Sequence, residues 1–308
     1  MDAWGNYWEK GHKTTFGEYF ANGYSRGYIH DWLVNIVGDA TAVLEVGCGN
    51  ASSLQVLIEA GFSGQYVGVD AAAASIPTDL RVPDSINARI ISRTPIESFS
   101  DGDISPDLAL SIYGLEYSDL TKSIPLLFKR IASNGRLAAL VHHAGSEISE
   151  MSKKAVGEFD YDTIKIGVEC LRAIDTELNV VDGDPSKLTG SAKANEARDK
   201  INDLISSVVN VDESDRNAIL VDFCQQVLRY FKILRQDSAS RAQYIDAIMP
   251  DFQASEERFK QMLSVAKTEE DAKSLVDRLT EAGFGQVSLR EVEFKGRAVA
   301  WEISALKS

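Results

Sequence analysis

A glycine-containing loop follows a short apolar segment near residue 45. Residues 43–51 read Val-Leu-Glu-Val-Gly-Cys-Gly-Asn-Ala. The apolar run predicts a buried strand that ends at Val46, and Gly47 and Gly49 allow the backbone to turn sharply and to approach a ligand closely. A helix predicted directly after the loop would point its free N–H groups at that ligand. The pattern therefore predicts a site for a nucleotide-like cofactor.

An acidic residue stands where such a site needs one. Asp70 ends the next predicted strand, roughly twenty residues past Gly49, the position that in nucleotide-binding α/β folds hydrogen-bonds a ribose. A dinucleotide is a poorer match, because reading G-x-G-x-x-G from Gly47 places Ser52 at the third glycine. Glu45 would also put a negative charge beside a pyrophosphate, whereas it suits a ligand with an ammonium and a sulfonium. A glycine turn without a ligand is the alternative.

Strands and helices alternate along the first half of the chain. The predicted strands are 42–46, 66–70, 88–92, 108–112 and 136–141. Strands separated by helices imply a parallel sheet with right-handed crossovers. The chain ends in two alternating segments around Lys295-Gly296, which predict a hairpin. We therefore predict an α/β fold, a Rossmann-like seven-stranded sheet with a closing antiparallel hairpin.

Between the fifth strand and the hairpin the strand pattern stops. Over residues 151–282 the apolar residues follow helical spacing, most clearly from Ile219 to Leu234. We predict a helical insertion over 151–282, which serves either as a cap over a substrate pocket or as a homodimer interface. The loop from Val181 to Ala194 is expected to be exposed.

These features together resemble the class I S-adenosylmethionine-dependent methyltransferases. The resemblance rests on Glu45-x-Gly47-x-Gly49 after a strand, on Asp70 after the next strand, on a fourth strand that ends in Ser111, and on the closing hairpin. It implies that the protein uses S-adenosylmethionine (SAM), releases S-adenosylhomocysteine (SAH) and requires no metal.

The resemblance covers residues 40–145 and 283–308 and departs at Ala51, where the family often has a third glycine. It implies a cofactor-binding domain over 41–150 and 283–308. By that resemblance, Glu45, Gly47 and Gly49 border the methionine part of the cofactor, and Asp70 holds its ribose. Arg93 or Thr94 lies by the adenine, and Ser111 and Ile112 lie under the cofactor. The neighbouring Cys48 and Ala71 belong to the same site. Thr94 fits a helix cap before Pro95 equally well.

Residues 1–40 are rich in aromatic side chains, Trp4 and Trp8 among them. In many small-molecule members of the family, the residues before the first strand fold over the cofactor, and aromatic faces favour a sulfonium. We therefore expect an N-terminal aromatic lid, with Tyr19 beside the methyl acceptor. For Tyr28 and Trp32 the alternative is packing between a helix and the sheet.

Two neighbouring histidines, His142 and His143, follow the fifth strand. Ligands of such sheets bind beyond the carboxyl ends of the strands, and adjacent strand residues point to opposite faces, so one of the two would face the acceptor. A histidine there is a candidate general base. The alternative is a histidine held by structural hydrogen bonds, since methyl transfer often needs only alignment.

Tyr113, Glu116 and Tyr117 leave the fourth strand toward the same region, either as acceptor contacts or as anchors of the loop. The segment is not the Asn/Asp-Pro-Pro-Tyr motif of enzymes that methylate amide or base nitrogens. The net charge of −14 argues against a nucleic-acid partner. No apolar run approaches the roughly 18 residues of a membrane span. The three cysteines have no metal-ligand spacing and are typical of a reduced, cytoplasmic protein.

The sequence thus predicts a SAM-dependent methyltransferase that acts on an oxygen or nitrogen of a small molecule. A methyltransferase that acts on protein or RNA is the first alternative. The second is a regulatory protein that binds SAM without turnover.

Overall fold

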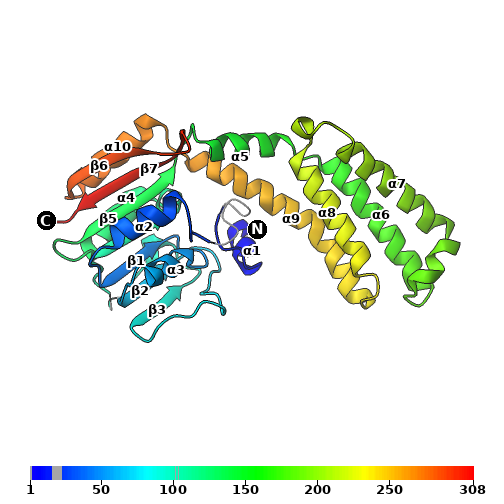
Figure 1. Cartoon of the computed structure of the whole chain (residues 1–308), viewed down its shortest axis with the longest axis horizontal. Helices are drawn as coiled ribbons and strands as arrows, with labels where there is room; N and C mark the ends of the chain where they lie inside the picture. The colour runs from blue at the N-terminus through cyan, green and yellow to red at the C-terminus, as the bar shows by residue number, and fades with distance from the viewer. Residues whose placement is uncertain (1, 16–22, 101, 103) are drawn as a thin grey trace. The chain divides into compact units, whose positions relative to one another are not determined.

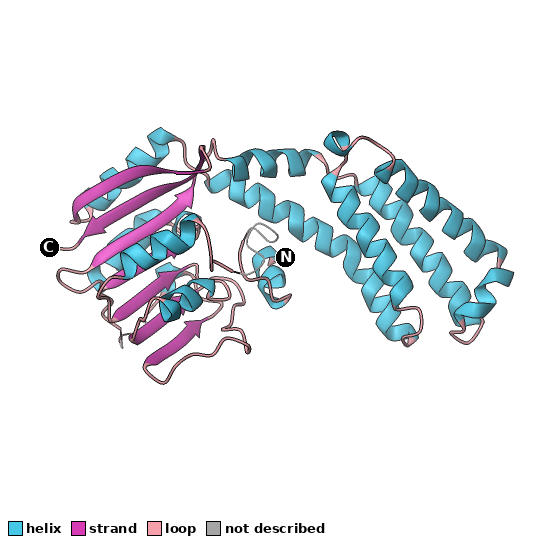
Figure 2. Ribbon diagram, in the orientation of Figure 1, coloured by secondary structure: helices cyan, strands magenta, loops and turns pink. Residues whose placement is uncertain are grey.

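A computed structural model of the 308-residue chain describes residues 2–15, 23–100, 102 and 104–308. The chain forms two compact units (Figure 1). The first comprises residues 1–150 and 261–308, and the second comprises residues 151–260. The first unit is an α/β domain and the second is helical (Figure 2).

A seven-stranded sheet organises the α/β unit, with strand order β3-β2-β1-β4-β5-β7-β6. The strands are β1 (Ala42–Val46), β2 (Gly64–Val69), β3 (Ile86–Ile91), β4 (Leu108–Ile112), β5 (Arg136–His142), β6 (Gly285–Phe294) and β7 (Arg297–Leu306). The first five are parallel, while β7 runs antiparallel to both β5 and β6. The predicted fold class, a Rossmann-like sheet with a closing hairpin, is confirmed.

The strand order creates a switch point between β1 and β4. From β1 the chain moves outward to β2 and β3, then crosses back to place β4 on the other side of β1. Ligands of doubly wound sheets bind at the carboxyl ends of the strands on either side of such a point. The loops after β1 and β4 are therefore the expected position of a ligand-binding site.

Helices cover both faces of this sheet. On one face lie α2 (Tyr28–Val37) and α3 (Ser52–Glu59), which bury Leu33 and Leu57 against the strands. On the other face lie α4 (Leu120–Arg130) and α10 (Glu269–Glu281). Because both faces are covered, the central strands are buried along their length, as β4 shows, and are mostly apolar. The remaining elements of the unit are α1 (Ala3–Glu9), η2 (Ile96–Ser98) and η3 (Leu115–Tyr117).

The helical insertion ends earlier than expected, at residue 260 rather than 282. The reason is α10, whose Leu275 and Leu279 are fully buried in the core beneath the sheet. A capping box between Thr268 and Asp271 begins this helix. Helical spacing alone could not show which core the apolar face of α10 joins.

The helical unit is a bundle with its own apolar core. Its helices are α6 (Tyr161–Val180), α7 (Ala192–Val209), α8 (Ala218–Lys232) and α9 (Ser238–Val265), joined by the short turns η4 (Pro185–Gly190) and η5 (Glu213–Asp215), with α5 (Glu147–Gly157) leading into it. Within the described residues, no helix is both long and apolar enough to cross a membrane.

A buried ion pair links two helices of the bundle. Arg241 Nε donates to Asp175 Oδ1 at 2.6 Å, and the Tyr230 hydroxyl donates to the same oxygen at 2.9 Å. The Arg241 side chain is only 2% exposed and that of Asp175 10%. A buried charge is costly once its partner is removed, so this pair makes the bundle sensitive to substitution.

We expect Asp175→Ala to lower the free energy of unfolding of the bundle by about 3–5 kcal/mol, because Arg241 would be left buried without its carboxylate. Urea unfolding followed by circular dichroism measures the loss. Glu196→Ala is the matched control, since Glu196 pairs with Lys200 on the exposed surface, where water and salt screen the pair, and its loss should leave the stability close to that of wild type. Equal losses in the two variants would contradict the importance of burial.

Candidate functional site

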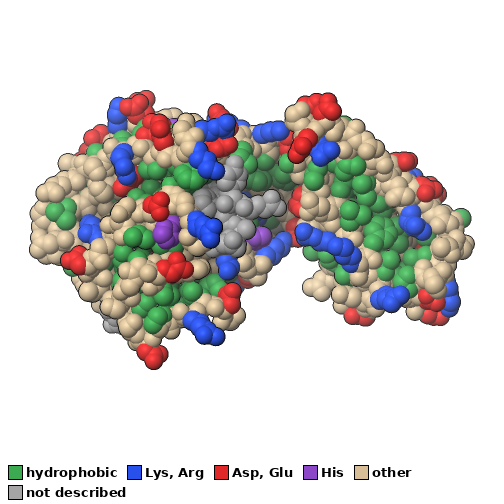
Figure 3. Space-filling model, in the orientation of Figure 1, with side chains coloured by type: hydrophobic (Ala, Val, Ile, Leu, Met, Phe, Trp, Pro, Cys, Tyr) green, Lys and Arg blue, Asp and Glu red, His purple; other side chains and the backbone are tan. Residues whose placement is uncertain are grey.

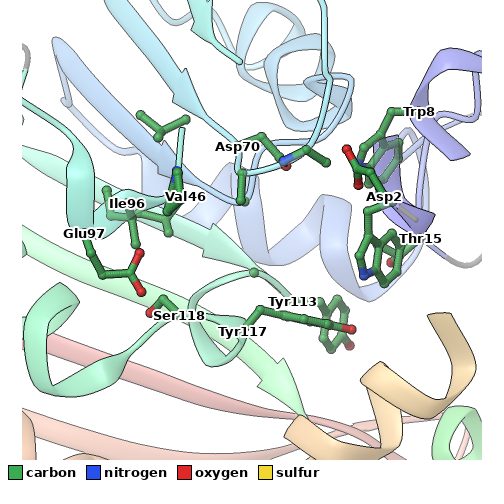
Figure 4. Close-up of a pocket in the computed structure, with 17 residues that line it drawn as sticks. Asp2, Trp8, Thr15, Val46, Asp70, Ile96, Glu97, Tyr113, Tyr117 and Ser118 are labelled. Atoms are coloured by element: carbon green, nitrogen blue, oxygen red, sulfur yellow. The ribbon is translucent and has the colours of Figure 1, made fainter. Parts of the chain in front are cut away.

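The carboxyl ends of β1, β2 and β4 meet at a cavity of about 380 Å³. Its described lining is Asp2, Trp4, Trp8, Thr15, Val46, Gly47, Val69, Asp70, Ala71, Ala72, Pro95, Ile96, Glu97, Tyr113, Gly114, Tyr117 and Ser118. Figure 4 shows Glu97 and Ser118 at one end, and Asp2 and Trp8 at the other. The volume lies within the usual range of roughly 300–1,000 Å³ for small-molecule sites.

Two glycines bring the loops after β1 and β4 into contact. A Cβ atom on Gly47 would lie 2.6 Å from the Cα of Gly114, and one on Gly114 would lie 2.6 Å from the carbonyl oxygen of Val46. Gly47 also has a φ of +69°, a conformation that favours glycine. The glycine at 47 is thus required by the protein's own backbone, in addition to any ligand that the cavity holds.

The N-terminal segment lies against the same glycine loop. A Cβ atom on Gly49 would lie 2.7 Å from the Trp8 ring. Asn50 Nδ2 donates to the carbonyl oxygens of Trp8 and His12, both at 2.9 Å. Trp4 stacks on Trp8 with ring centroids 6.0 Å apart, and both rings line the cavity. The aromatic residues at the start of the chain therefore form one wall of the site.

Asp70 lines the cavity with its carboxylate held on both oxygens. Oδ2 accepts the N–H of Gly49 and Oδ1 accepts the N–H of Ala72, each at 2.8 Å. Burial raises the pKa of Asp70, and the two backbone N–H groups act in the opposite direction. The carboxylate is therefore fixed in place before any ligand binds, with the neighbouring Ala71 also in the lining.

Tyr113 leaves β4 in a constrained conformation. Its φ is +55°, which is uncommon for a residue with a side chain. Its hydroxyl lies 2.7 Å from that of Tyr28 and donates to the carbonyl oxygen of Val299 at 3.2 Å. Its ring stacks on His142 with centroids 4.6 Å apart. Contacts at both ends hold this ring in the cavity wall.

Tyr117 connects the N-terminal wall with the end of β5. Its ring meets Trp4 edge to face, with centroids 5.7 Å apart. Its hydroxyl lies 3.3 Å from His142 Nε2. Burial raises the pKa of Tyr117, so the phenol keeps its proton.

The two candidate histidines point in different directions, as adjacent strand residues should. His142 is buried behind Tyr113 and Tyr117 and does not line the cavity, and burial lowers its pKa to about 3. His143 places Nε2 3.2 Å from a Glu291 carboxylate oxygen and stacks on Trp301. His142 therefore reaches the cavity only through the tyrosines, and His143 belongs to a structural cluster beside the hairpin.

Glu45 does not line the cavity. It is buried beneath the loop, where its carboxylate accepts hydrogen bonds from the hydroxyls of Ser53 and Tyr66. Burial raises the pKa of Glu45 to about 7, and the two hydrogen bonds lower it. Its role here is to tie β1, α3 and β2 together under the glycine loop.

Four other predicted residues also support the cavity from below. The Ser111 hydroxyl donates to the Val46 carbonyl at 2.9 Å and accepts from the N–H of Leu115 at 2.8 Å. Glu116 Oε1 accepts the backbone N–H of His142 at 2.7 Å. Cys48 and Ile112 are buried, and neither lines the cavity.

Arg93 and Thr94, the residues predicted to lie by an adenine, are not among the described lining residues of the cavity. Arg93 adopts a φ of +54° and places its guanidinium 3.5 Å from Glu9, outside the cavity lining. The Thr94 hydroxyl donates to the carbonyl oxygen of Ser92 at 3.2 Å. The cavity is lined instead by residues 95–97. Tyr19 lies outside the described residues.

Sequence reasoning did not identify ten of the described lining residues as parts of the site: Asp2, Thr15, Val46, Val69, Ala72, Pro95, Ile96, Glu97, Gly114 and Ser118. The apolar Pro95-Ile96 pair directly after the third strand was the available signal for residues 95–97. Asp2 carries no comparable signal, since its recognisable role is to cap α1 by accepting the N–H of Gly5 at 2.8 Å. In the described part of the chain, no group of three or more acidic, histidine or cysteine side chains could hold a metal ion.

Comparison with known proteins gives matches only among solved structures. No protein-family model matches the chain. No curated protein matches it either. The plantazolicin methyltransferase BpumL, in complex with a triazolic desmethylPZN analog and SAH, is 10% identical, with 99% of this chain and 90% of that chain covered and a TM-score of 0.46.

Two further matches are covered over less than two thirds of their own length. One is the methyltransferase in complex with the Haloferax volcanii Trm112 activator, which is 13% identical with a TM-score of 0.36 over 46% of this chain. The other is a hemolysin from Streptococcus thermophilus, 11% identical with a TM-score of 0.39 over 91% of this chain. The chain spans 62% and 64% of their lengths. The strand order and the antiparallel β7, rather than these scores, show that the chain has the class I methyltransferase fold.

The buried His142 gives a pH dependence whose sign is fixed. Because its pKa is lowered to about 3 in the fold, between pH of about 6.5 and 3 only the unfolded chain binds a proton at this residue. We expect this residue to reduce the free energy of unfolding by about 1.4 kcal/mol for each pH unit of acidification in that window. Thermal or urea unfolding of wild type and His142→Asn, from pH 7 to pH 4, measures the difference in slope.

His30→Asn is the matched control, since the His30 side chain is partly exposed and sits outside the cavity. Parallel pH profiles for wild type and His142→Asn would contradict the lowered pKa, because His142 would then bind protons equally in the folded and unfolded chain.

Proposed function

We propose that the protein is a SAM-dependent methyltransferase that acts on an oxygen or nitrogen of a small molecule. One observation supports this most strongly. At the switch point of the sheet, a single cavity is lined both by the Gly47 backbone and by the fixed carboxylate of Asp70. SAM would supply a methyl group activated by its positively charged sulfur.

The donor set of the cavity fits this cofactor. A carboxylate at the end of β2 matches ribose hydroxyls. The apolar side chains of Pro95 and Ile96 match the faces of an adenine, and the rings of Trp4 and Trp8 suit a sulfonium. No Lys or Arg stands among the described lining residues, which argues against a pyrophosphate ligand.

The chain's own residues would act chiefly by positioning. Asp70 would hold the ribose end, while Tyr113 and Tyr117 form a rigid wall beside the reacting groups. Trp4 and Trp8 would close the site against water. Alignment of this kind is sufficient to account for a large part of the rate of a bimolecular transfer.

We also propose that the bundle of residues 151–260 covers the acceptor. Support comes from where its two connections leave the α/β unit. The segment after β5 leads into the bundle, and the returning chain pairs with the end of β5, where the Lys267 N–H donates to the His142 carbonyl at 2.7 Å. Both connections therefore start at the edge of the sheet formed by the carboxyl ends of the parallel strands.

The surface charge also favours a small-molecule acceptor. On the face shown in Figure 3, basic side chains are interspersed with acidic and apolar ones, which suits a small molecule better than a nucleic acid.

We expect Asp70→Ala to weaken SAH binding by about 1.5–3 kcal/mol, because a hydrogen-bonding charged partner of the ribose is lost. Isothermal titration calorimetry measures the change. Asp199→Ala, at an exposed position on α7, should bind like wild type. Since Asp70 also accepts two backbone N–H groups, Asp70→Asn is tested alongside and unfolding is followed for each. Absence of SAH binding by the wild type would refute the proposed function.

Coverage of the acceptor predicts a change in hydrogen exchange. When SAH and a methylated acceptor bind together, amides of the bundle should exchange more slowly than with SAH alone. Mass spectrometry of peptides from residues 151–260 measures the protection, with peptides from β6 in the α/β unit as internal reference. If the bundle exchanges at the same rate in both states, it is a passive element or a homodimer interface.

A further inference from the structure

The Tyr117 hydroxyl has its hydrogen-bond direction set by a buried partner. It lies 3.3 Å from His142 Nε2, and its ring lines the cavity. Burial keeps the proton on Tyr117 by raising its pKa, and it keeps His142 neutral by lowering the pKa of the imidazole to about 3. A neutral imidazole offers one nitrogen as an acceptor. When that nitrogen is Nε2, Tyr117 donates its proton to His142.

That direction determines what Tyr117 presents to the cavity. In the tautomer in which Nε2 is the acceptor, the one proton of Tyr117 points at His142, and the phenol oxygen has only lone pairs left to offer. A ligand group that meets it must therefore donate an N–H or O–H. An oxygen anion at this point would face lone pairs and would be repelled.

The charges of the cavity further restrict the chemical class of the acceptor group. Its described lining includes the carboxylates of Asp2, Asp70 and Glu97, with no Lys, Arg or His among the described lining residues. The rings of Trp4, Trp8, Tyr113 and Tyr117 also line it. Carboxylates and aromatic faces favour cationic groups and N–H donors, and a buried carboxylate or phenolate of an acceptor would lack a counter-charge.

We propose that the methyl acceptor is an amine nitrogen, and that Tyr117, with its own proton donated to His142, accepts a hydrogen bond from that nitrogen. This inference rests on the proposed methyltransferase function. It assigns Tyr117 the selection and orientation of the acceptor, and it assigns His142 a positioning role through Tyr117.

The transfer balances without a strong base. The amine loses a proton to solvent before reaction, and its lone pair then forms the new N–C bond while the electron pair of the breaking S–C bond stays on sulfur. The positive charge thus moves from sulfur to nitrogen. An alcohol would instead need to lose its proton as the methyl arrives, and His142 is too weak a base to take it through Tyr117.

The tautomer of His142 tests the hydrogen-bond direction directly. The chain contains four histidines, so ring nitrogens in a ¹⁵N NMR spectrum of the full chain saturated with SAH can be assigned with the His142→Asn variant. We expect His142 to carry its proton on Nδ1, and Tyr117→Phe to shift the Nε2 resonance. A proton found on Nε2 would overturn the proposal, because Tyr117 would then be free to donate to the ligand.

Binding of matched probes tests the acceptor class. Phenethylamine, 2-phenylethanol and 3-phenylpropanoate differ only in the terminal group, and their affinities for the SAH-saturated protein are measured by NMR titration. We expect the amine to bind at least tenfold more tightly than the other two, and Tyr117→Phe to remove most of that preference when each variant is measured at its own SAH saturation. Tyr244→Phe is the matched control, since this hydroxyl donates to the Gln226 carbonyl and does not line the cavity.

The outcomes separate the two proposals. Failure of wild type to bind SAH refutes the methyltransferase function itself. Binding of SAH without preference for the amine, or with the preference retained in Tyr117→Phe, refutes only the role of Tyr117 and the amine acceptor.

Discussion

The close contact between Gly47 and Gly114 is the constraint on which the candidate site depends. Each glycine occupies space that a side chain on the other would need, so the loops after β1 and β4 meet backbone to backbone. This contact brings the end of β4, with Tyr113 and Tyr117, beside the glycine loop. A bulkier residue at either position would separate the two halves of the cavity wall, because backbone atoms cannot move aside as a flexible side chain can.

The glycine loop also organises the N-terminal segment. Gly49 leaves room for the Trp8 ring, and Asn50 binds two carbonyl oxygens of the segment. The same short motif therefore shapes the cavity on one side and anchors its aromatic wall on the other. Because the glycine loop both lines the cavity and holds the N-terminal segment, a change in the loop on ligand binding would also shift the aromatic wall that Trp8 belongs to.

Burial decides the chemistry of the polar groups around the cavity. Asp70, whose carboxylate is held by backbone N–H groups, lines the cavity, while Glu45, of the same chemical type, is enclosed by hydroxyls beneath the loop. His142 is held neutral by desolvation and reaches the cavity only through tyrosine side chains. Position relative to the cavity, rather than residue type, therefore separates groups that contact a ligand from groups that support the wall.

Local sequence patterns were enough to predict the sheet, its closing hairpin and the loops that line the candidate site. Buried parallel strands and glycine loops follow from local patterns, namely apolar runs, turn residues and the spacing of Gly47 and Asp70, and these patterns need no knowledge of distant contacts. Only the tertiary structure decided which side of a strand each polar residue faces and which core a helix joins. Glu45 is buried beneath the loop and does not line the cavity, and His142 and His143 contact different residues. Residues 95–97, rather than Arg93, line the cavity. Helix α10 packs beneath the sheet rather than in the insertion. Each outcome depends on packing between segments distant in the chain, which no local pattern encodes.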